Sequence, residues 1–245
     1  MINKIKFWKE WKNKTDLEKS AIKSLKAGKK IILDNLPKEE IVSIYIKGSF
    51  PRREMNGKSD VDIVVILKTI KYLQKINKLE KKYKQEYQPE IQFIVYSLWE
   101  LKTGKKLKNK GKNKASTSRV VKHLNNYYLI YGKALEEEKL FYRSDEKDLD
   151  LMIKVFKEKF LMDYQEKRFG FSEIIKQVFW LVENEEKTKG NNPPHNWKKL
   201  AESIEDNDNI IHDALELRLN PTKDKKIRRN FIIKLKKYLK VLEKN

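Results

Sequence analysis

The sequence of 245 residues has no cysteine, only eight glycines and six prolines, and no long apolar run. The absence of cysteine excludes disulfide bonds, thiolate metal sites and a cysteine nucleophile, and it is compatible with a reducing intracellular setting. No apolar run approaches the roughly 20 residues that a membrane span needs. The opening MINKIKFWKEWKNK lacks the apolar core of a signal peptide. These absences predict a soluble cytoplasmic protein with no membrane partner.

Negative charge is also scarce relative to positive charge. Lys and Arg number 56 and Asp and Glu 35, which gives a formal net charge of +21. Such an excess attracts polyanions, and nucleic acid is the usual one. Lys, Asn and Ile are all abundant, however, so a bias toward AT-rich codons explains the charge equally well. Composition alone therefore leaves RNA binding open.

The stretch from Ile44 to Leu67 is the most informative part of the chain. An apolar run ends at Gly48-Ser49, a polar interval follows, and Asp60-Val61-Asp62 opens a second apolar run. This pattern predicts a strand, a turn and a second strand. Side chains alternate faces along a strand, so Asp60 and Asp62 are expected to point the same way, about 7 Å apart. Two carboxylates on one face can share a pair of Mg²⁺ ions.

The turn before the aspartates has the composition of a phosphate site. Gly48 lets the backbone approach a phosphate closely, and Ser49 adds a hydroxyl and an amide donor. Arg52 and Arg53 can pair with phosphate oxygens in a fork geometry. The alternative is an ordinary hairpin or crossover whose aspartates merely start a strand. Asp is depleted inside strands, so two of them on one face need a reason.

The spacing of Gly48-Ser49, ten residues, then Asp60-Val61-Asp62 resembles the signature of the polymerase-β-type nucleotidyltransferase superfamily. The similarity is strongest to its small stand-alone domains. It implies transfer of a nucleoside monophosphate from an NTP to an acceptor hydroxyl, with release of pyrophosphate. It also implies two Mg²⁺ ions held by the aspartates, and nucleotide binding by Gly48, Ser49, Arg52 and Arg53.

The superfamily usually places a third carboxylate on a third strand, predicted here over residues 90–96. The segment IVYSLWEL, residues 94–101, resembles the end of that strand and the start of the following helix in the family, and this resemblance puts Gln92 at the position of the third carboxylate. Glu90 lies two residues earlier on the same face. Glu90 is the candidate third catalytic and metal-binding acid, and a solvated strand start is its alternative. Because Gln92 is uncharged, a non-catalytic module that binds RNA or a partner also stays open.

Helical patterns surround these strands. We expect a short amphipathic helix over 2–14, a helix capped by Thr15 or Asp16 with a weak point at Gly28, and helices over 70–87, from Ser97, and from Ser116 or Thr117 to about 131. The lysine-rich segment 104–114 is predicted to be a loop. It either contacts phosphates or is a solvated connector between two helices. Residues 1–135 are therefore predicted to form an α+β catalytic domain with a small mixed sheet.

Charge replaces hydrophobicity from Glu136 to Asp148, which places the domain boundary there. Residues 145–245 show helical periodicity and predict an all-α bundle. The region resembles the helical half of kanamycin-type nucleotidyltransferases and the HEPN bundles. The residues that carry this resemblance are Gly190, Pro194, His195, Trp197 and Leu200. No arginine after residue 140 precedes a histidine at the HEPN ribonuclease spacing, so ribonuclease activity is not predicted. His195 and His212 are expected to pack or cap.

The acceptor is the least determined part of this hypothesis. An RNA 3′ end suits the charge and the lysine-rich segment, and it ranks first. An aminoglycoside-like small molecule would need an acidic cleft for its amines. The cluster of acids in the sequence that could line such a cleft is Glu136, Glu137, Glu138, Asp145 and Asp148. A protein hydroxyl needs no signature that can be recognised. The sequence indicates neither the preferred NTP nor the oligomeric state.

Overall fold

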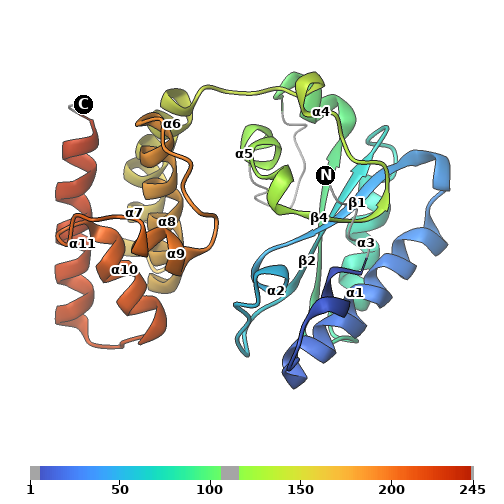
Figure 1. Ribbon diagram of the computed structural model, residues 1–245, viewed down its shortest axis with the longest axis horizontal. Helices are drawn as coiled ribbons and strands as arrows, with labels where there is room; N and C mark the ends of the chain where they lie inside the picture. The colour runs from blue at the N-terminus through green and yellow to red at the C-terminus, as the bar shows by residue number, and fades with distance from the viewer. Residues whose placement is uncertain (1–5, 106–115, 244–245) are drawn as a thin grey trace. The chain divides into compact units, whose positions relative to one another are not determined.

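The computed structural model describes residues 6–105 and 116–243, so most of the lysine-rich segment 104–114 lies outside the described residues. The chain divides into two compact units, residues 1–142 and 143–245. Figure 1 labels the elements of both units.

The first unit contains a four-stranded mixed sheet of order β3-β2-β1-β4. Strand β1 (Ile41–Lys47) is antiparallel to β2 (Val61–Leu67) and to β4 (Tyr128–Gly132), whereas β2 is parallel to β3 (Ile91–Ser97). The two central strands are nearly continuous runs of Ile and Val because both of their faces are covered. The predicted α+β class is confirmed.

Two layers of helices cover the sheet (Figure 1). Helices α1 (Asp16–Asn35) and α3 (Leu73–Tyr83) pack on the face that carries Ile44, Ile63 and Phe93. Helices α4 (Leu98–Thr103) and α5 (Thr117–Lys122) supply core residues to the other face, which carries Val64 and Tyr96. The face to which a strand residue belongs therefore follows from its place in the alternation.

Helix α1 starts as predicted and runs without a break. Thr15 and Glu18 form a reciprocal capping box, in which each side chain accepts a hydrogen bond from the other residue's backbone N–H. The expected weak point at Gly28 lies inside the helix, where an added Cβ would clash with Ile63 Cδ1. Gly28 therefore permits close approach of the helix to the sheet.

The predicted amphipathic helix over 2–14 is replaced, within the described residues, by a single 3-10 turn, η1 (Phe7–Glu10). Phe7 is buried and its ring lies 4.2 Å from that of Tyr128 in a stacked arrangement. It also approaches Phe50, with 5.8 Å between the ring centroids. Phe7, together with the partly buried Trp8 and Trp11, holds this segment against the core without a regular helix.

The helix predicted from Ser116 to about 131 is wrong in its second half. Ser116 caps α5 as expected, but α5 ends at Lys122, and a 3-10 turn η3 (Leu124–Asn126) leads into β4. Strand β4 pairs with β1, with Leu129 opposite Tyr45. Tyr and Ile suit a pleated surface as well as a helix, and the open edge of β1 decides between the two structures.

The second unit is an all-α bundle. Helix α6 (Asp145–Val155), the π-helical segment η5 (Phe156–Phe160) and α7 (Leu161–Gln165) follow one another directly. Helices α8 (Phe171–Thr188), α9 (Trp197–Glu202), α10 (Ile210–Leu219) and α11 (Lys225–Leu242) complete it. None of the helices in the described part of the chain is long and apolar enough to span a membrane.

Candidate active site

Asp62 is the second residue of β2 and Asp60 directly precedes the strand, and both lie on the sheet face that α1 and α3 do not cover. Val61 and Ile63 belong to the core beneath α1 and α3, whereas Val64 belongs to the core on the other face. Asp62 alternates with these residues and therefore lies on the face of Val64, and Asp60, two residues earlier, has the same orientation. The Val61 N–H donates to the Glu90 carbonyl at 2.8 Å, so the strand geometry extends back to this point.

The glycine-serine turn is in contact with the second aspartate. Gly48 directly follows β1 and precedes the four-residue helix α2 (Ser49–Arg52), and its backbone has φ +89° and ψ −158°, a region that side chains disfavour. A Cβ added to Gly48 would lie 2.5 Å from Oδ2 of Asp62. The backbone of the turn and the carboxylate are therefore close enough for one nucleotide to touch both.

Strand β3 places Gln92, and not Glu90, beside Asp62. Asp62 and Gln92 are paired in the parallel register, so both side chains lie on the same face. Glu90 lies one pleat repeat earlier. Its side chain is 42% exposed, and Oε2 is 3.6 Å from Lys84 Nζ. The role of Glu90 as a third acid stays a prediction.

Residues 25–123, which contain the turn, both aspartates and Gln92, match the nucleotidyltransferase domain family. Residues 25–123 form a nucleotidyltransferase domain. This match confirms the resemblance to the polymerase-β-type superfamily and supports nucleotidyl transfer as the general function. Domains of this family generally use divalent metal ions. A comparison with curated proteins finds no match to the chain.

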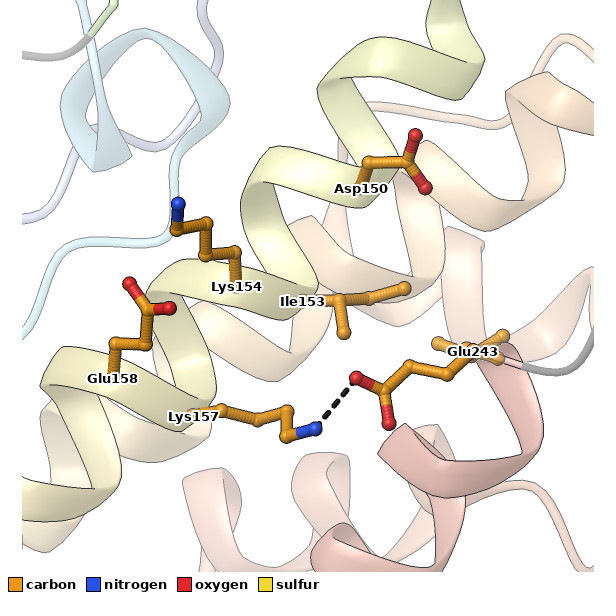
Figure 2. A pocket seen from close by; sticks show the side chains of 7 residues that line it. Asp150, Ile153, Lys154, Lys157, Glu158 and Glu243 are labelled. Carbon is orange, nitrogen blue, oxygen red and sulfur yellow. Dashed lines mark hydrogen bonds and ion pairs between the residues drawn. The ribbon is translucent and has the colours of Figure 1, made fainter.

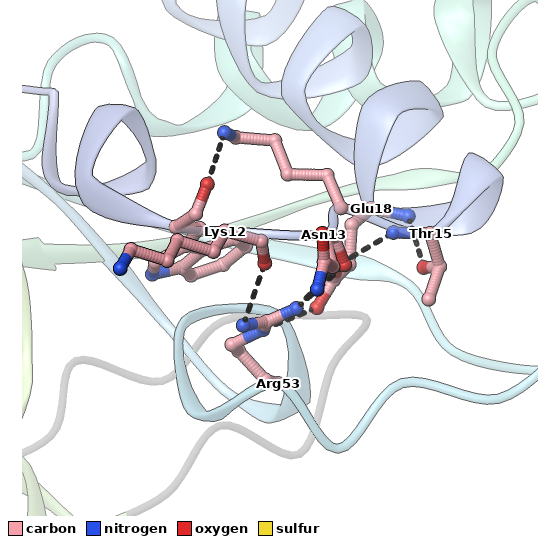
Figure 3. A network of polar contacts seen from close by, with 7 residues as sticks. Lys12, Asn13, Thr15, Glu18 and Arg53 are labelled. Carbon is pink, nitrogen blue, oxygen red and sulfur yellow. Dashed lines mark hydrogen bonds and ion pairs between the residues drawn. The ribbon is translucent and has the colours of Figure 1, made fainter.

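Within the nucleotidyltransferase domain, the two arginines of the turn have carboxylate partners. Arg52 Nε donates to Glu54 Oε2 at 2.6 Å. Arg53 donates from Nε to Glu18 Oε1 at 2.7 Å, from Nη2 to Glu18 Oε2 at 3.1 Å, and to the Asn13 carbonyl at 3.2 Å (Figure 3). Arg53 thus ties the turn to the start of α1. Nucleotide binding by either arginine stays a prediction.

The ion pair between Arg53 and Glu18 makes stability depend on pH. The hydrogen bond from Arg53 lowers the pKa of the Glu18 carboxyl from 4.5. A carboxyl whose pKa is lowered by folding stabilises the folded state above its unfolded pKa, and this contribution is lost as the pH falls through the folded value. We expect Arg53→Gln to lower the thermal unfolding midpoint at neutral pH, by an amount that shrinks below pH 4.5.

Circular dichroism melts of wild type and variant between pH 3 and 7 measure this difference, and Arg168→Gln provides the control. Arg168 pairs with Asp163 at 2.7 Å, but its side chain is 63% exposed, so the substitution should change little. A difference for Arg53→Gln that is the same at every pH would contradict the assigned contact.

Lys47 is a charged neighbour of the site that the sequence did not predict. It is paired with Asp62 in the antiparallel register of β1 and β2, and directly opposed residues project on the same face. Lys47 precedes Gly48 in the sequence, so its proximity to the turn was evident. Its position opposite Asp62 depends on the strand register, for which the sequence alone gives no signal.

A separate pocket lies in the helical unit, between the α6–η5 segment and the end of α11 (Figure 2). Its lining combines acids and lysines, and Lys157 Nζ is 2.5 Å from Glu243 Oε1. Charges of both signs line this pocket, and its chemistry does not match the nucleotide site. The lining residues are Asp150, Ile153, Lys154, Lys157, Glu158, Leu242 and Glu243.

Two histidines of the helical unit lie beside aromatic or polar groups, and the packing or capping roles expected of them stay predictions. The ring of His195 lies 5.2 Å from the Trp180 ring, and its Nδ1 is 3.6 Å from Glu183 Oε2. His212 Nε2 is 3.1 Å from the Asp206 carbonyl oxygen.

Proposed function

We propose that the protein transfers a nucleoside monophosphate from an NTP to an acceptor hydroxyl and releases pyrophosphate, with Asp60 and Asp62 as ligands of Mg²⁺. The observation that carries this proposal is the contact between the Gly48 backbone and the Asp62 carboxylate. It brings a phosphate-sized glycine turn and a metal-binding carboxylate to one point. Carboxylate and phosphate oxygens are the ligands that Mg²⁺ prefers, so these residues fit the ion.

The chain's own residues would act mainly by positioning. Gly48 and Ser49 present the backbone and a hydroxyl to the phosphates, while Asp60 and Asp62 hold the cation beside them. The acceptor oxygen attacks the α-phosphorus, the bond to the bridging oxygen breaks, and the acceptor proton leaves to a base, for which Glu90 is the candidate. Bound Mg²⁺ supplies charge neutralisation and lowers the pKa of the attacking hydroxyl. The sequence-based expectation is two such ions.

RNA is the acceptor that we propose, and helix α11 supports it. The helix has eight lysines and arginines and no acid. Its apolar stripe, with Phe231, Leu235 and Leu239, is buried in the bundle and is not available to insert into a membrane. Six basic side chains are exposed to solvent, and within the described residues none of them forms an ion pair: Lys225, Lys226, Arg229, Lys236, Lys237 and Lys240.

Some other basic residues of the same unit are paired with acids, whereas the six exposed ones of α11 follow one another along a helix that has no acid. Lys176 pairs with Glu173 at 2.8 Å, Lys189 with Glu185 at 2.9 Å, and Lys198 with Glu202 at 3.8 Å. Helix α11 thus carries a row of exposed positive charges along one face. Phosphates along a nucleic acid strand complement such a face.

A charge-matched pair of triple variants tests this surface. Lys236→Gln/Lys237→Gln/Lys240→Gln removes three exposed charges of α11, and Lys176→Gln/Lys189→Gln/Lys198→Gln removes three paired ones. We expect the α11 variant to bind single-stranded RNA at least roughly tenfold more weakly and to lower the slope of log K against log salt by about 2. Fluorescence anisotropy measures both quantities. Equal losses in the two variants, or no loss in the first, would contradict the assignment of RNA to this face.

Small molecules and protein hydroxyls remain the alternative acceptors. The acids that an aminoglycoside-like acceptor would need are partly neutralised, since Asp148 accepts a hydrogen bond from Arg143 at 3.0 Å and Glu136 pairs with Lys139. Incubation with radiolabelled NTPs, Mg²⁺ and total RNA separates the classes. Label in RNA supports tailing, label on protein supports protein modification, and no label under any condition would favour a binding module without activity.

A further inference from the structure

Asp62 is flanked on the two neighbouring strands by side chains that are not acidic. On β1, Lys47 is opposite it, and on β3, Gln92 is opposite it, and all three side chains lie on one sheet face. Of the three positions side by side across the sheet at this level, one is anionic, one is neutral and one is cationic. Asp60 adds a second carboxylate on the same face.

We infer that this site holds one divalent cation together with the NTP, and that the ammonium group of Lys47 supplies the second positive charge to the triphosphate. The inference rests on the proposed function, and it revises the expected number of ions. Two Mg²⁺ ions about 4 Å apart repel each other strongly, and carboxylates shared between them offset that repulsion. Here the residue beside Asp62 on β3 is an uncharged amide, and the residue on its other side already carries a positive charge.

Glu90 does not restore the missing negative charge at this level of the sheet. It lies one pleat repeat before Gln92, its carboxylate is 42% exposed, and Lys84 Nζ lies 3.6 Å from it. Solvent and Lys84 both weaken its field at the Asp62 position. The carboxylates that remain for metal binding are Asp60 and Asp62, which suffice for one ion that also binds phosphate oxygens.

The chemistry of Lys47 suits this role. Its side chain is partly buried, and it adjoins Gly48, whose backbone forms the phosphate-sized turn. A lysine ammonium is a compact point charge on a flexible stem, so it can follow the phosphates without needing a fixed fork geometry. Lys47 would thereby bind the nucleotide directly, as one of the residues that contact it.

Counting bound Mn²⁺ in the presence of a nonhydrolysable ATP analogue tests the inference. The electron paramagnetic resonance signal of free Mn²⁺ falls as the ion binds, so it gives the number of bound ions, which should be one per wild-type complex. Lys47→Met/Gln92→Asp, which removes the cation and adds a carboxylate, should bind two, and Gln92→Asp alone should bind the second ion more weakly. Two ions in wild type, or no second ion in either variant while both retain the wild-type circular dichroism spectrum, would overturn the inference.

The same titration separates this inference from the proposed function. A wild-type protein that binds neither Mn²⁺ nor the analogue would overturn both, whereas two bound ions in wild type would overturn only this inference and leave the proposed function in place. Analogue affinity gives a second readout. Lys47→Met should weaken it about tenfold, Lys47→Arg should restore most of it, and Lys68→Met, at the far end of β2, should leave it unchanged. Equal affinities for wild type and Lys47→Met would also overturn the inference.

Discussion

Asp62→Asn is expected to reduce nucleotide transfer roughly 1000-fold or more, because it removes a charged metal ligand at the point where the phosphates must be held. The side chain is only partly buried and the two residues have the same shape, so the fold should persist. Incorporation of radiolabel under single-turnover conditions measures the loss, and circular dichroism checks the fold. Asp60→Asn should behave in the same way.

Asp34→Asn is the matched control for these substitutions. Asp34 is exposed near the end of α1, and its substitution removes the same charge from the same unit. Its activity should equal that of wild type. An Asp62→Asn protein that still labels its acceptor at a rate near that of wild type would contradict the role of the aspartate pair.

Gly48→Ala is expected to abolish nucleotide binding and to destabilise the first unit. The backbone at Gly48 has φ +89°, and the new Cβ would lie 2.5 Å from Oδ2 of Asp62. A side chain in this conformation costs about 1–3 kcal/mol, and the displaced carboxylate would no longer face the phosphates. Nucleotide affinity by calorimetry and the thermal midpoint measure the two effects separately.

Gly57→Ala isolates the cause of that loss. Gly57 lies in the same connection between β1 and β2, and a Cβ added there meets no atom within 4 Å. It should keep wild-type affinity. Similar losses in the two variants would mean that the connection as a whole, and not the contact between Gly48 and Asp62, sets nucleotide affinity.

The parts of the fold that the sequence predicted are those with a local signal. Thr15 with Glu18, and Ser97 with Glu100, form the caps that start α1 and α4. Asn220-Pro221 separates α10 from α11, because proline cannot continue a helix. In each case the residues that decide the structure lie within a few positions of one another.

The errors arose where distant segments decide the structure. Residues 128–132 form β4 because β1 offers an edge to pair with, although their apolar spacing also fits a helix. Gly28 continues α1 because the sheet approaches that side of the helix, and its glycine character alone suggested a weak point. Tertiary packing overrides local propensity at both places.

The same distinction applies to the site. The spacing of Gly48, Asp60 and Asp62 indicated the chemistry, and the structure brings Gly48 against Asp62. The positions of Lys47 and Gln92 beside Asp62 depend on the registers of two strand pairs. The partnership of Arg53 with Glu18 joins residues 35 positions apart in the chain. Spacing in the sequence carries no information on contacts of that kind.

The most direct test of nucleotidyl transfer compares NTPs that carry radiolabel on the α- or the γ-phosphate. In the presence of Mg²⁺ and RNA, the wild-type protein should transfer the α-label to the acceptor and release the γ-label as pyrophosphate, and Asp62→Asn should do neither. Transfer of the γ-label to the acceptor, or equal α-labelling by wild type and Asp62→Asn, would contradict a nucleotidyltransferase site built on the aspartate pair.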